Sequence, residues 1–161
     1  MRVGQGFDIH RFVDDVVSDR KLILGGVHFK GERGLIGHSD ADVLLHAICD
    51  ALLGALALGD IGEHFPNTDP AYKGIDSKIL LSKCVALIHQ KGYQVVNVDA
   101  TLCLEEPKIR PFVASMQAAI APLLQVQVDA VSIKATTTEK MGFAGREEGL
   151  MAQATVLLQQ S

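Results

Sequence analysis

The sequence lacks the features that would assign it at once to a disulfide-rich or thiolate-metal class. It has only three cysteines among 161 residues, and no two of them have C-x-x-C spacing. An odd and dispersed set favours neither a disulfide framework nor a cysteine zinc site. We therefore expect Cys49, Cys84 and Cys103 to be small core residues in a reducing compartment.

Long apolar runs and blocks of like charge are also missing. The longest apolar stretches, such as residues 51–58, fall well short of the ~20 residues that span a membrane. The N-terminus shows no signal or transit peptide, so a cytoplasmic location is expected. The net charge is -4 without a Lys/Arg cluster, which argues against nucleic-acid binding. Neither membranes nor nucleic acids are expected partners.

The patterns that are present predict one α+β domain over residues 1–161, with a mixed sheet packed against about three helices. Strands are expected at residues 2–9, 22–28, 96–104, 131–136 and 150–158. The segment 96–104 alternates apolar and polar residues with period two, as a half-buried strand does. Within 22–28, the pair Gly25-Gly26 indicates a bulge or a close backbone approach.

Three helices are expected between these strands. Residues 42–57 carry apolar side chains with a 3.6-residue period, after Ser39 and Asp40 as candidate N-caps. A second helix is predicted over 76–91, ending at Gly92. A third begins with Pro111 in its first turn, and Pro122 should end or kink it.

A candidate metal site combines the first strand with the first helix. Asp8 and His10 are two apart on a strand, so their side chains point to the same side. Such a pair is weak evidence alone, and the favoured interpretation of His46 alone is a core-edge histidine paired with a carboxylate. Together the three form a two-imidazole, one-carboxylate set with an open fourth position, typical of catalytic zinc. Asp42 or Asp50, one turn from His46, could then fix its tautomer.

Two loops are candidates for binding phosphate. Residues 37–42 lead into the first helix, whose N-terminal amides favour anions, and His38 and Ser39 could add donors. The plainer interpretation is a capping segment. In residues 134–140, three successive threonine hydroxyls precede Glu139, which could hold a hard cation such as Mg²⁺. The alternative there is an edge strand with a solvated Glu.

Seven short segments carry the recognisable motifs of the chain: 6–10 (GFDIH), 38–42 (HSDAD), 45–47 (LHA), 59–62 (GDIG), 65–69 (FPNTD), 97–99 (NVD) and 134–140 (KATTTEK). In order, spacing and content they resemble the 2-C-methyl-D-erythritol 2,4-cyclodiphosphate synthase family over roughly residues 1–158. The resemblance implies a homotrimer whose sheets face a central channel and whose active sites are shared between subunits. It also implies a channel that could take an isoprenoid diphosphate.

The implied reaction converts 4-diphosphocytidyl-2-C-methyl-D-erythritol 2-phosphate into the cyclic diphosphate and CMP. By matching position, Asp8, His10 and His46 hold one Zn²⁺ per subunit, and Glu139 binds Mg²⁺ or Mn²⁺. His38 and Thr137 have catalytic roles in orienting the substrate and stabilising the transition state.

The resemblance also implies a set of substrate-binding residues. Beside the metal they are Asp8, His10, His38 and Ser39. On the methylerythritol side they are Asp60, Ile61, Gly62, Phe65, Pro66, Asn67, Thr68 and Asp69. Around cytidine they are Leu104, Glu105, Glu106, Pro107, Lys108, Ile109 and Arg110. Thr136, Thr137, Thr138 and Glu139 form the diphosphate side, with Phe143 and Arg146 completing the set.

The chain departs from the family pattern at three places. Asn67 replaces a commoner Asp, Glu105-Glu106 stand where smaller or less charged residues are commoner, and Glu147 stands where Gly is commoner.

Two other functions stay open at this point. One is a zinc-dependent phosphodiesterase in which metal-bound water attacks phosphate. The other is a non-enzymatic trimer that binds an isoprenoid diphosphate in a channel lined by Phe7, Phe143, Arg146 and Glu148. Binding of CMP would separate that module from the enzyme.

Overall fold

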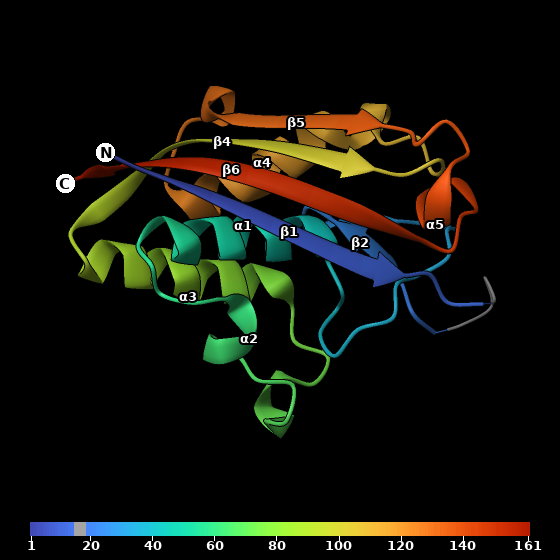
Figure 1. The fold of residues 1–161 in the computed structure, drawn as a ribbon, viewed down its shortest axis with the longest axis horizontal. Helices are drawn as coiled ribbons and strands as arrows, with labels where there is room; N and C mark the ends of the chain where they lie inside the picture. The colour runs from blue at the N-terminus through green and yellow to red at the C-terminus, as the bar shows by residue number, and fades with distance from the viewer. Residues whose placement is uncertain (15–18) are drawn as a thin grey trace.

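A four-stranded sheet forms one layer of the structure, a computed structural model that describes residues 1–14 and 19–161 (Figure 1). Its strands are β1 (Arg2–Arg11), β4 (Tyr93–Cys103), β5 (Val131–Thr136) and β6 (Gly149–Gln160), in the order β1-β6-β4-β5. β6 runs antiparallel to β1 and β4, whereas β4 and β5 are parallel. The predicted α+β fold with a mixed sheet is confirmed.

Three long helices form the second layer. They are α1 (Val43–Ala55), α3 (Ser77–Gln90) and α4 (Val113–Leu124). α1 lies against β1 and β6, α4 lies against β5, and α3 packs on both other helices (Figure 1). Because α1 sits between the sheet and α3, it is buried around almost its whole circumference, which explains why its sequence is more apolar than an amphipathic surface helix.

Two further helices of one turn each raise the expected number from about three to five within the described ranges. They are α2 (Ile61–His64) and α5 (Gly142–Gly145). Short 3-10 turns add η1 (Pro70–Tyr72), η2 (Arg110–Phe112) and η3 (Val128–Ala130). Single turns are too short to show a 3.6-residue period, so periodicity could not reveal them. None of the helices in residues 1–14 and 19–161 has the length and apolar character needed to cross a membrane.

The strand predicted over residues 22–28 is wrong, because the segment reverses direction. It forms a hairpin of β2 (Leu22–Leu24) and β3 (Val27–Phe29), paired antiparallel. The backbone has φ of 58° at Gly25 and 75° at Gly26. Positive φ at two successive residues is what a tight two-residue hairpin turn requires, and glycine adopts it at little cost.

Most other predicted elements are confirmed with small changes at their ends. β4 begins earlier than expected and contains an irregularity between Val95 and Asn97, so the alternation is regular only from Val98 onward. α3 begins after its N-cap Asp76, and Gly92 follows its C-cap, as predicted. Pro122 lies inside the last turn of α4, which ends at Leu124.

The side chains of β1 alternate in a way that positions the candidate site. Gly4 and Gly6 are buried against α1, and Asp8 and His10 continue along the same side of the strand. The opposite side of β1 faces outward, on the sheet face that the helices leave uncovered. Its exposed apolar residues are Val3, Phe7 and Ile9.

Candidate active site

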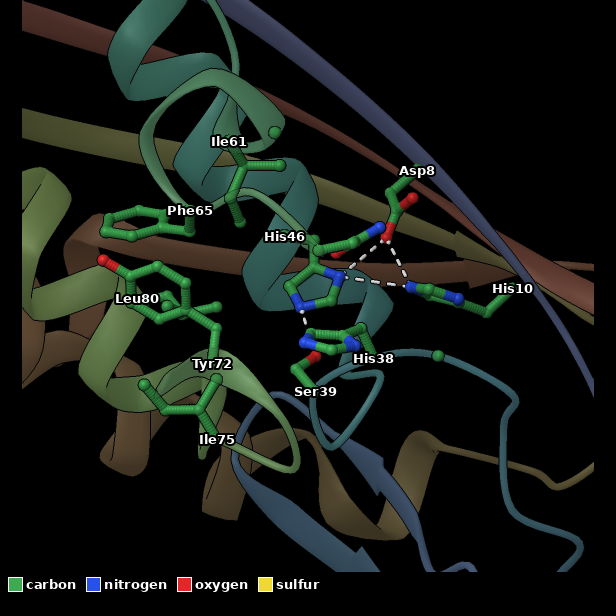
Figure 2. Close-up of a pocket in the computed structure, with 13 residues that line it drawn as sticks. Asp8, His10, His38, Ser39, His46, Ile61, Phe65, Tyr72, Ile75 and Leu80 are labelled. Atoms are coloured by element: carbon green, nitrogen blue, oxygen red, sulfur yellow. Dashed lines mark hydrogen bonds and ion pairs between the residues drawn. The ribbon is translucent and has the colours of Figure 1, made fainter. Parts of the chain in front are cut away.

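Asp8, His10 and His46 form a compact triangle of potential metal ligands between β1 and α1 (Figure 2). The Asp8 Oδ2 atom lies 3.0 Å from both His10 Nε2 and His46 Nδ1, and these two nitrogens are 3.2 Å apart. Ligands bound about 2.0–2.1 Å from a tetrahedral Zn²⁺ lie about 3.3 Å from one another. The sides of the triangle fit that geometry, and its atoms come from residue types that bind zinc.

Hydrogen bonds on the far side of each ring orient the two imidazoles. His10 Nδ1 lies 2.9 Å from the Ile36 carbonyl oxygen, which only accepts, so Nδ1 donates and Nε2 is the nitrogen that faces the site. On His46 the ring is reversed: Nδ1 faces Asp8, while Nε2 lies 2.9 Å from Ser77 Oγ and 3.1 Å from Ser39 Oγ. Both rings thus direct one nitrogen to the same point.

The electrostatics of the triangle favour an ionised Asp8. Burial by itself raises the pKa of Asp8, but hydrogen bonds and charge attraction from His10 and His46 outweigh it and hold that pKa well below its ordinary value. Burial likewise lowers the pKa of His10, and the Asp8 carboxylate more than reverses this, so the pKa of His10 is raised. A metal ion bound at His10 Nε2 would compete with a proton at that nitrogen.

His46 does not use the partners that its own helix suggested. The Asp42 carboxylate is fully buried and accepts the amides of Gly25, Gly26, Leu44 and Leu45 at 2.6–3.2 Å. The Asp50 carboxylate accepts the Ile61 amide at 2.7 Å. The expectation that Asp42 or Asp50 fixes the His46 tautomer is therefore wrong, because backbone groups occupy both carboxylates.

The N-terminus of α1 also differs from expectation. Its N-cap is Asp42, where Ser39 or Asp40 was predicted, and the amides of Leu44 and Leu45 both donate to the Asp42 side chain. Those amides are therefore committed to the cap, and the phosphate site predicted on this helix end is not supported. His38 just before the helix is different, since its buried Nε2 has no hydrogen-bond partner among the described residues.

A cavity of about 230 Å³ opens beside the triangle (Figure 2). It brings together nine of the residues predicted from the sequence, from three separate parts of the chain. They are Asp8, His10, His38, Ser39, His46, Ile61, Gly62, Phe65 and Asn67. The substituted position Asn67 is thus part of the wall.

Other predicted residues of the 60–69 segment do not line this cavity and instead shape the backbone around it. Asp60 caps α2 by accepting the Glu63 amide at 2.9 Å, and Asp69 caps η1 by accepting the Ala71 amide at the same distance. Pro66 and Thr68 lie between these caps and are not among the lining side chains.

Three lining residues, Tyr72, Ile75 and Leu80, were missed from the sequence, and a further one, Gly37, belongs to the predicted loop 37–42. Tyr72 and Phe65 are in edge-to-face contact, with ring centroids 5.4 Å apart, and form an apolar wall opposite the triangle (Figure 2). Leu80 carried a signal, because it lies on the apolar side of the predicted helix 76–91. Tyr72 and Ile75 carried none, since they lie in an irregular loop without a periodic pattern.

A second pocket of about 190 Å³ lies where β4 and β5 end. It joins two segments predicted to hold the nucleotide and the diphosphate. The lining residues are Leu104, Glu105, Pro107, Lys108, Ile109, Ala135, Thr136 and Thr137. Ala135 was not predicted, and Glu106, Arg110 and Thr138 are outside the lining.

Glu105 ties the two segments of this pocket together. Its buried carboxylate accepts the Thr138 amide, the Thr138 hydroxyl and the Lys140 amide at 3.1–3.2 Å, and the Lys140 ammonium lies 3.1 Å away. Burial alone raises the pKa of Glu105, but the bonds from Lys140 and Thr138 lower it below its ordinary value. Glu139 and Lys140 both have positive φ, of 54° and 65°, and this carboxylate holds that turn.

A third pocket of about 200 Å³ lies at the end of β1, against α5. Phe143 and Glu148, two of the predicted channel residues, line it with Ile9 and His10. Arg146 is held by Glu148, with Nε and Oε1 2.7 Å apart. The intervening Glu147 has φ of 56°, a conformation that glycine adopts most readily.

The chain is similar to known proteins in both sequence and structure. The sequence matches the YgbB family over residues 1–159. It is 58% identical to a protein of Phocaeicola vulgatus named 2-C-methyl-D-erythritol 2,4-cyclodiphosphate synthase, over 100% of this chain and 98% of that protein.

Solved structures agree with the sequence match. The bifunctional IspDF of Campylobacter jejuni superposes with a TM-score of 0.93 at 40% identity, covering 99% of this chain and 42% of that longer one. The CDP complex of IspF from Plasmodium falciparum superposes with a TM-score of 0.86 at 33% identity, covering 99% and 96%. The chain therefore shares its fold with both structures and matches nearly the whole of the second.

Proposed function

The chain belongs to the YgbB family, and on that premise we propose that it converts 4-diphosphocytidyl-2-C-methyl-D-erythritol 2-phosphate to 2-C-methyl-D-erythritol 2,4-cyclodiphosphate and CMP. It is an enzyme of isoprenoid synthesis and a cyclising lyase. The observation that carries the proposal is the ligand triangle of Asp8, His10 and His46 beside a cavity. Most of the residues that the family resemblance assigned to the metal and its surroundings line that cavity.

The reaction forms one P–O bond and breaks another, without water. An oxygen of the 2-phosphate attacks the β-phosphorus, and the bond from that phosphorus to the CMP oxygen breaks. Because the nucleophile is already an anion, no strong general base is required. When bound, Zn²⁺ at the triangle and Mg²⁺ or Mn²⁺ at Glu139 would neutralise charge on the phosphate oxygens.

The chain's own residues have the task of holding both phosphates in line. His38 is suited to this, because its buried Nε2 has no partner within the described ranges and can donate to a phosphate oxygen. Thr137 lines the second pocket, with its hydroxyl 3.2 Å from Glu139 Oε1. Ser39 adds a hydroxyl beside His46. Such preorganised donors are the main means of stabilising phosphoryl transfer.

The apolar wall of the first cavity is suited to the methylerythritol part of the substrate. Ile61, Phe65 and Leu80 present hydrocarbon to the cavity, opposite the charged triangle. A carbon chain placed there would displace water from the reacting phosphates. Exclusion of water favours attack by the tethered phosphate, since oriented intramolecular reactions reach effective molarities of roughly 10⁵–10⁸ M.

We propose a homotrimer with active sites shared between subunits. The residues assigned to one reaction line two different pockets in a single chain, one with the triangle and one with Lys108. A neighbouring copy could bring its nucleotide pocket to the triangle of the first. The uncovered sheet face, with exposed Val3, Phe7 and Ile9, offers an apolar surface for packing around a channel.

Two further assignments belong to the same proposal. An isoprenoid diphosphate could occupy the channel near Phe143 and Arg146, where the Arg146 guanidinium would have to exchange its Glu148 partner for the diphosphate. Binding of CDP to the Plasmodium falciparum relative supports a cytidine nucleotide at the second pocket. The three cysteines are free and buried, as in a reducing cytoplasmic setting.

Phosphorus NMR of the reaction tests the function. The purified protein, Zn²⁺ and Mg²⁺ are mixed with the substrate, and the spectra are followed with time. Cyclisation predicts two coupled resonances of a cyclic diphosphate that grow together with CMP. CMP accompanied by a linear bisphosphate would instead identify a zinc phosphodiesterase, and binding of an isoprenoid diphosphate without turnover would identify a binding module.

A further inference from the structure

We propose that Ser77 and Asp40 are positioning residues that hold His46 in its metal-binding orientation. They form a carboxylate–hydroxyl–imidazole chain behind the ring, on the side away from the triangle. This inference rests on the proposed metal site, because it assigns His46 Nδ1 as the ligand atom. Ser77 was not predicted for the site and is 31 residues from His46 in the sequence, and Asp40 was predicted only as part of the loop before α1.

The contacts of Ser77 form a continuous line. Its Oγ lies 2.9 Å from His46 Nε2 and donates to Asp40 Oδ1 at 2.5 Å. The Ser77 amide donates to the other carboxylate oxygen, Asp40 Oδ2, at 3.1 Å. Asp40 therefore holds both the backbone and the hydroxyl of Ser77, and that hydroxyl cannot turn away without losing a charge-assisted hydrogen bond.

The chemistry of the groups sets the direction of every proton in this line. An ionised carboxylate only accepts, so the Ser77 hydroxyl must donate to Asp40. The Ser77 oxygen then presents its lone pairs to His46, which makes Nε2 the donor. A neutral imidazole carries one N–H, so with Nε2 as the donor, Nδ1 has a lone pair available to a metal held between Asp8 and His10. This is the tautomer that a metal requires.

Burial strengthens this carboxylate–hydroxyl–imidazole chain. Ser77 is 0% exposed and His46 is 9% exposed, so water does not compete for the hydroxyl or for Nε2. Capping does not explain the hydroxyl, because α3 already has Asp76 as its N-cap. Ser39 also contacts Nε2, at 3.1 Å, but its oxygen accepts the Ala41 amide and is not linked to a carboxylate by these contacts.

Asp40 also connects the metal side to the loop that forms the apolar wall. Its own amide donates to the Ile75 carbonyl at 3.0 Å, two residues before Ser77. The chain from Asp40 through Ser77 to His46 therefore joins residues from the loop before α1, from α1 itself and from α3. A substitution of Asp40 or Ser77 should therefore change how His46 is oriented for metal binding, without changing any atom that faces the metal.

The test compares Ser77→Ala and Asp40→Asn with the wild type and with Ser82→Ala. Ser82 is a matched control, because it lies on the same helix and its exposed hydroxyl donates to the Lys78 carbonyl of that helix. Asp40→Asn conserves volume, so the test survives if Ser77→Ala folds poorly. Two quantities are measured: the Zn²⁺ affinity by chelator competition, and the His46 tautomer by nitrogen NMR in metal-free protein at alkaline pH.

We expect Ser77→Ala and Asp40→Asn to weaken Zn²⁺ binding by about 10- to 100-fold, with Ser82→Ala within about twofold of the wild type. In the metal-free protein, the fraction of His46 protonated at Nε2 should fall in both variants and stay constant in Ser82→Ala. The double variant should be no weaker than the worse single variant, because both changes break the same line.

Unchanged tautomer populations in both variants would overturn the positioning role, even if Zn²⁺ binds. Equal Zn²⁺ affinity of all four proteins would do the same. A wild-type protein that binds no Zn²⁺ would instead refute the proposed metal site, while the tautomer measurement, which needs no metal, would still decide the role of Ser77 and Asp40. The two proposals can therefore fail separately.

Discussion

Gly6 of β1 lies so close to Ala47 of α1 that a Cβ atom on Gly6 would stand 1.9 Å from the Ala47 carbonyl oxygen. This contact sets the separation of strand and helix. It thereby also sets the separation of Asp8 and His10, further along the strand, from His46 on the helix. The stability of the fold and the geometry of the ligand triangle thus depend on the same glycine.

Gly6→Ala should therefore lower the free energy of unfolding by about 3 kcal/mol, because overpacked backbone must move apart. Gly54→Ala is the control: Gly54 lies in α1 near the same strand, but its nearest neighbour beyond the helix would be 3.7 Å from the new Cβ. There we expect a gain of about 0.5–1 kcal/mol from helix propensity. Denaturant unfolding measures both, and equal stability of the two variants would contradict the account.

The second prediction concerns the metal. His46→Ala should abolish stoichiometric Zn²⁺ binding, because the triangle loses one of its three ligands. His28→Ala, which removes an exposed histidine in β3, should keep full binding. Metal analysis after dialysis distinguishes the two. Because the pKa of His10 is raised, the affinity should also fall as the pH is lowered. Full Zn²⁺ content in His46→Ala would refute the site.

The third prediction separates catalysis from metal binding. His38→Ala and Thr137→Ala should each lower turnover by about 10²–10³-fold, the usual loss when one preorganised donor to a developing charge is removed. Both variants should retain the Zn²⁺ content of the wild type, since neither residue belongs to the triangle. Parallel kinetics and metal analysis test this, and a loss of zinc equal to the loss of activity would contradict it.

The fourth prediction uses the pH dependence of stability. The pKa of Glu105 is lower in the folded protein than its ordinary value of 4.5, so its ionised form stabilises the fold. That contribution is fully present above pH 4.5 and is lost as the pH falls through the lower folded pKa. Glu105→Gln should therefore be less stable than the wild type at neutral pH, with a difference that shrinks in acid. Unfolding curves from pH 3 to 7 measure it.

Lys108→Gln provides the comparison for Glu105→Gln. Lys108 lines the same pocket and is exposed, and its ammonium donates to the Glu105 carbonyl and faces Glu106. The stability of Lys108→Gln should differ little from that of the wild type at any pH between 3 and 7. If the stability difference between Glu105→Gln and the wild type stays constant down to pH 3, the ionisation of Glu105 does not contribute to stability as predicted.

The fifth prediction tests the shared active site. Asp8→Ala and Lys108→Ala proteins, each with low activity, should recover activity when unfolded together and refolded. If each site takes its triangle from one subunit and its nucleotide pocket from the next, about a quarter of sites in an equal mixture combine two intact halves. Activity of the mixture should approach that fraction. No recovery, with mixed trimers demonstrated by mass, would place each site within one chain.

The sequence by itself determined the elements with a regular period and the residues whose spacing follows from that period. Asp8 and His10 share one side of β1 because strand side chains alternate, and their convergence could be predicted from two positions. Helices α1 and α3 were predicted from apolar periodicity together with cap residues, and the regular part of β4 was predicted from its period-two alternation. These features depend on neighbours within one element, so a linear pattern contains them.

Only the tertiary structure decided how His46 is held. Asp42 and Asp50 lie one turn from it on either side, but the Asp42 carboxylate accepts the amides of Gly25 and Gly26, and the Asp50 carboxylate accepts the Ile61 amide at the start of α2. The ring nitrogen Nε2 instead contacts Ser39 and Ser77, and Ser77 is 31 residues away and is brought to the ring by the packing of α3 on α1. Buried polar groups must find partners wherever the fold supplies them, and that choice depends on long-range contacts that leave no periodic trace in the sequence.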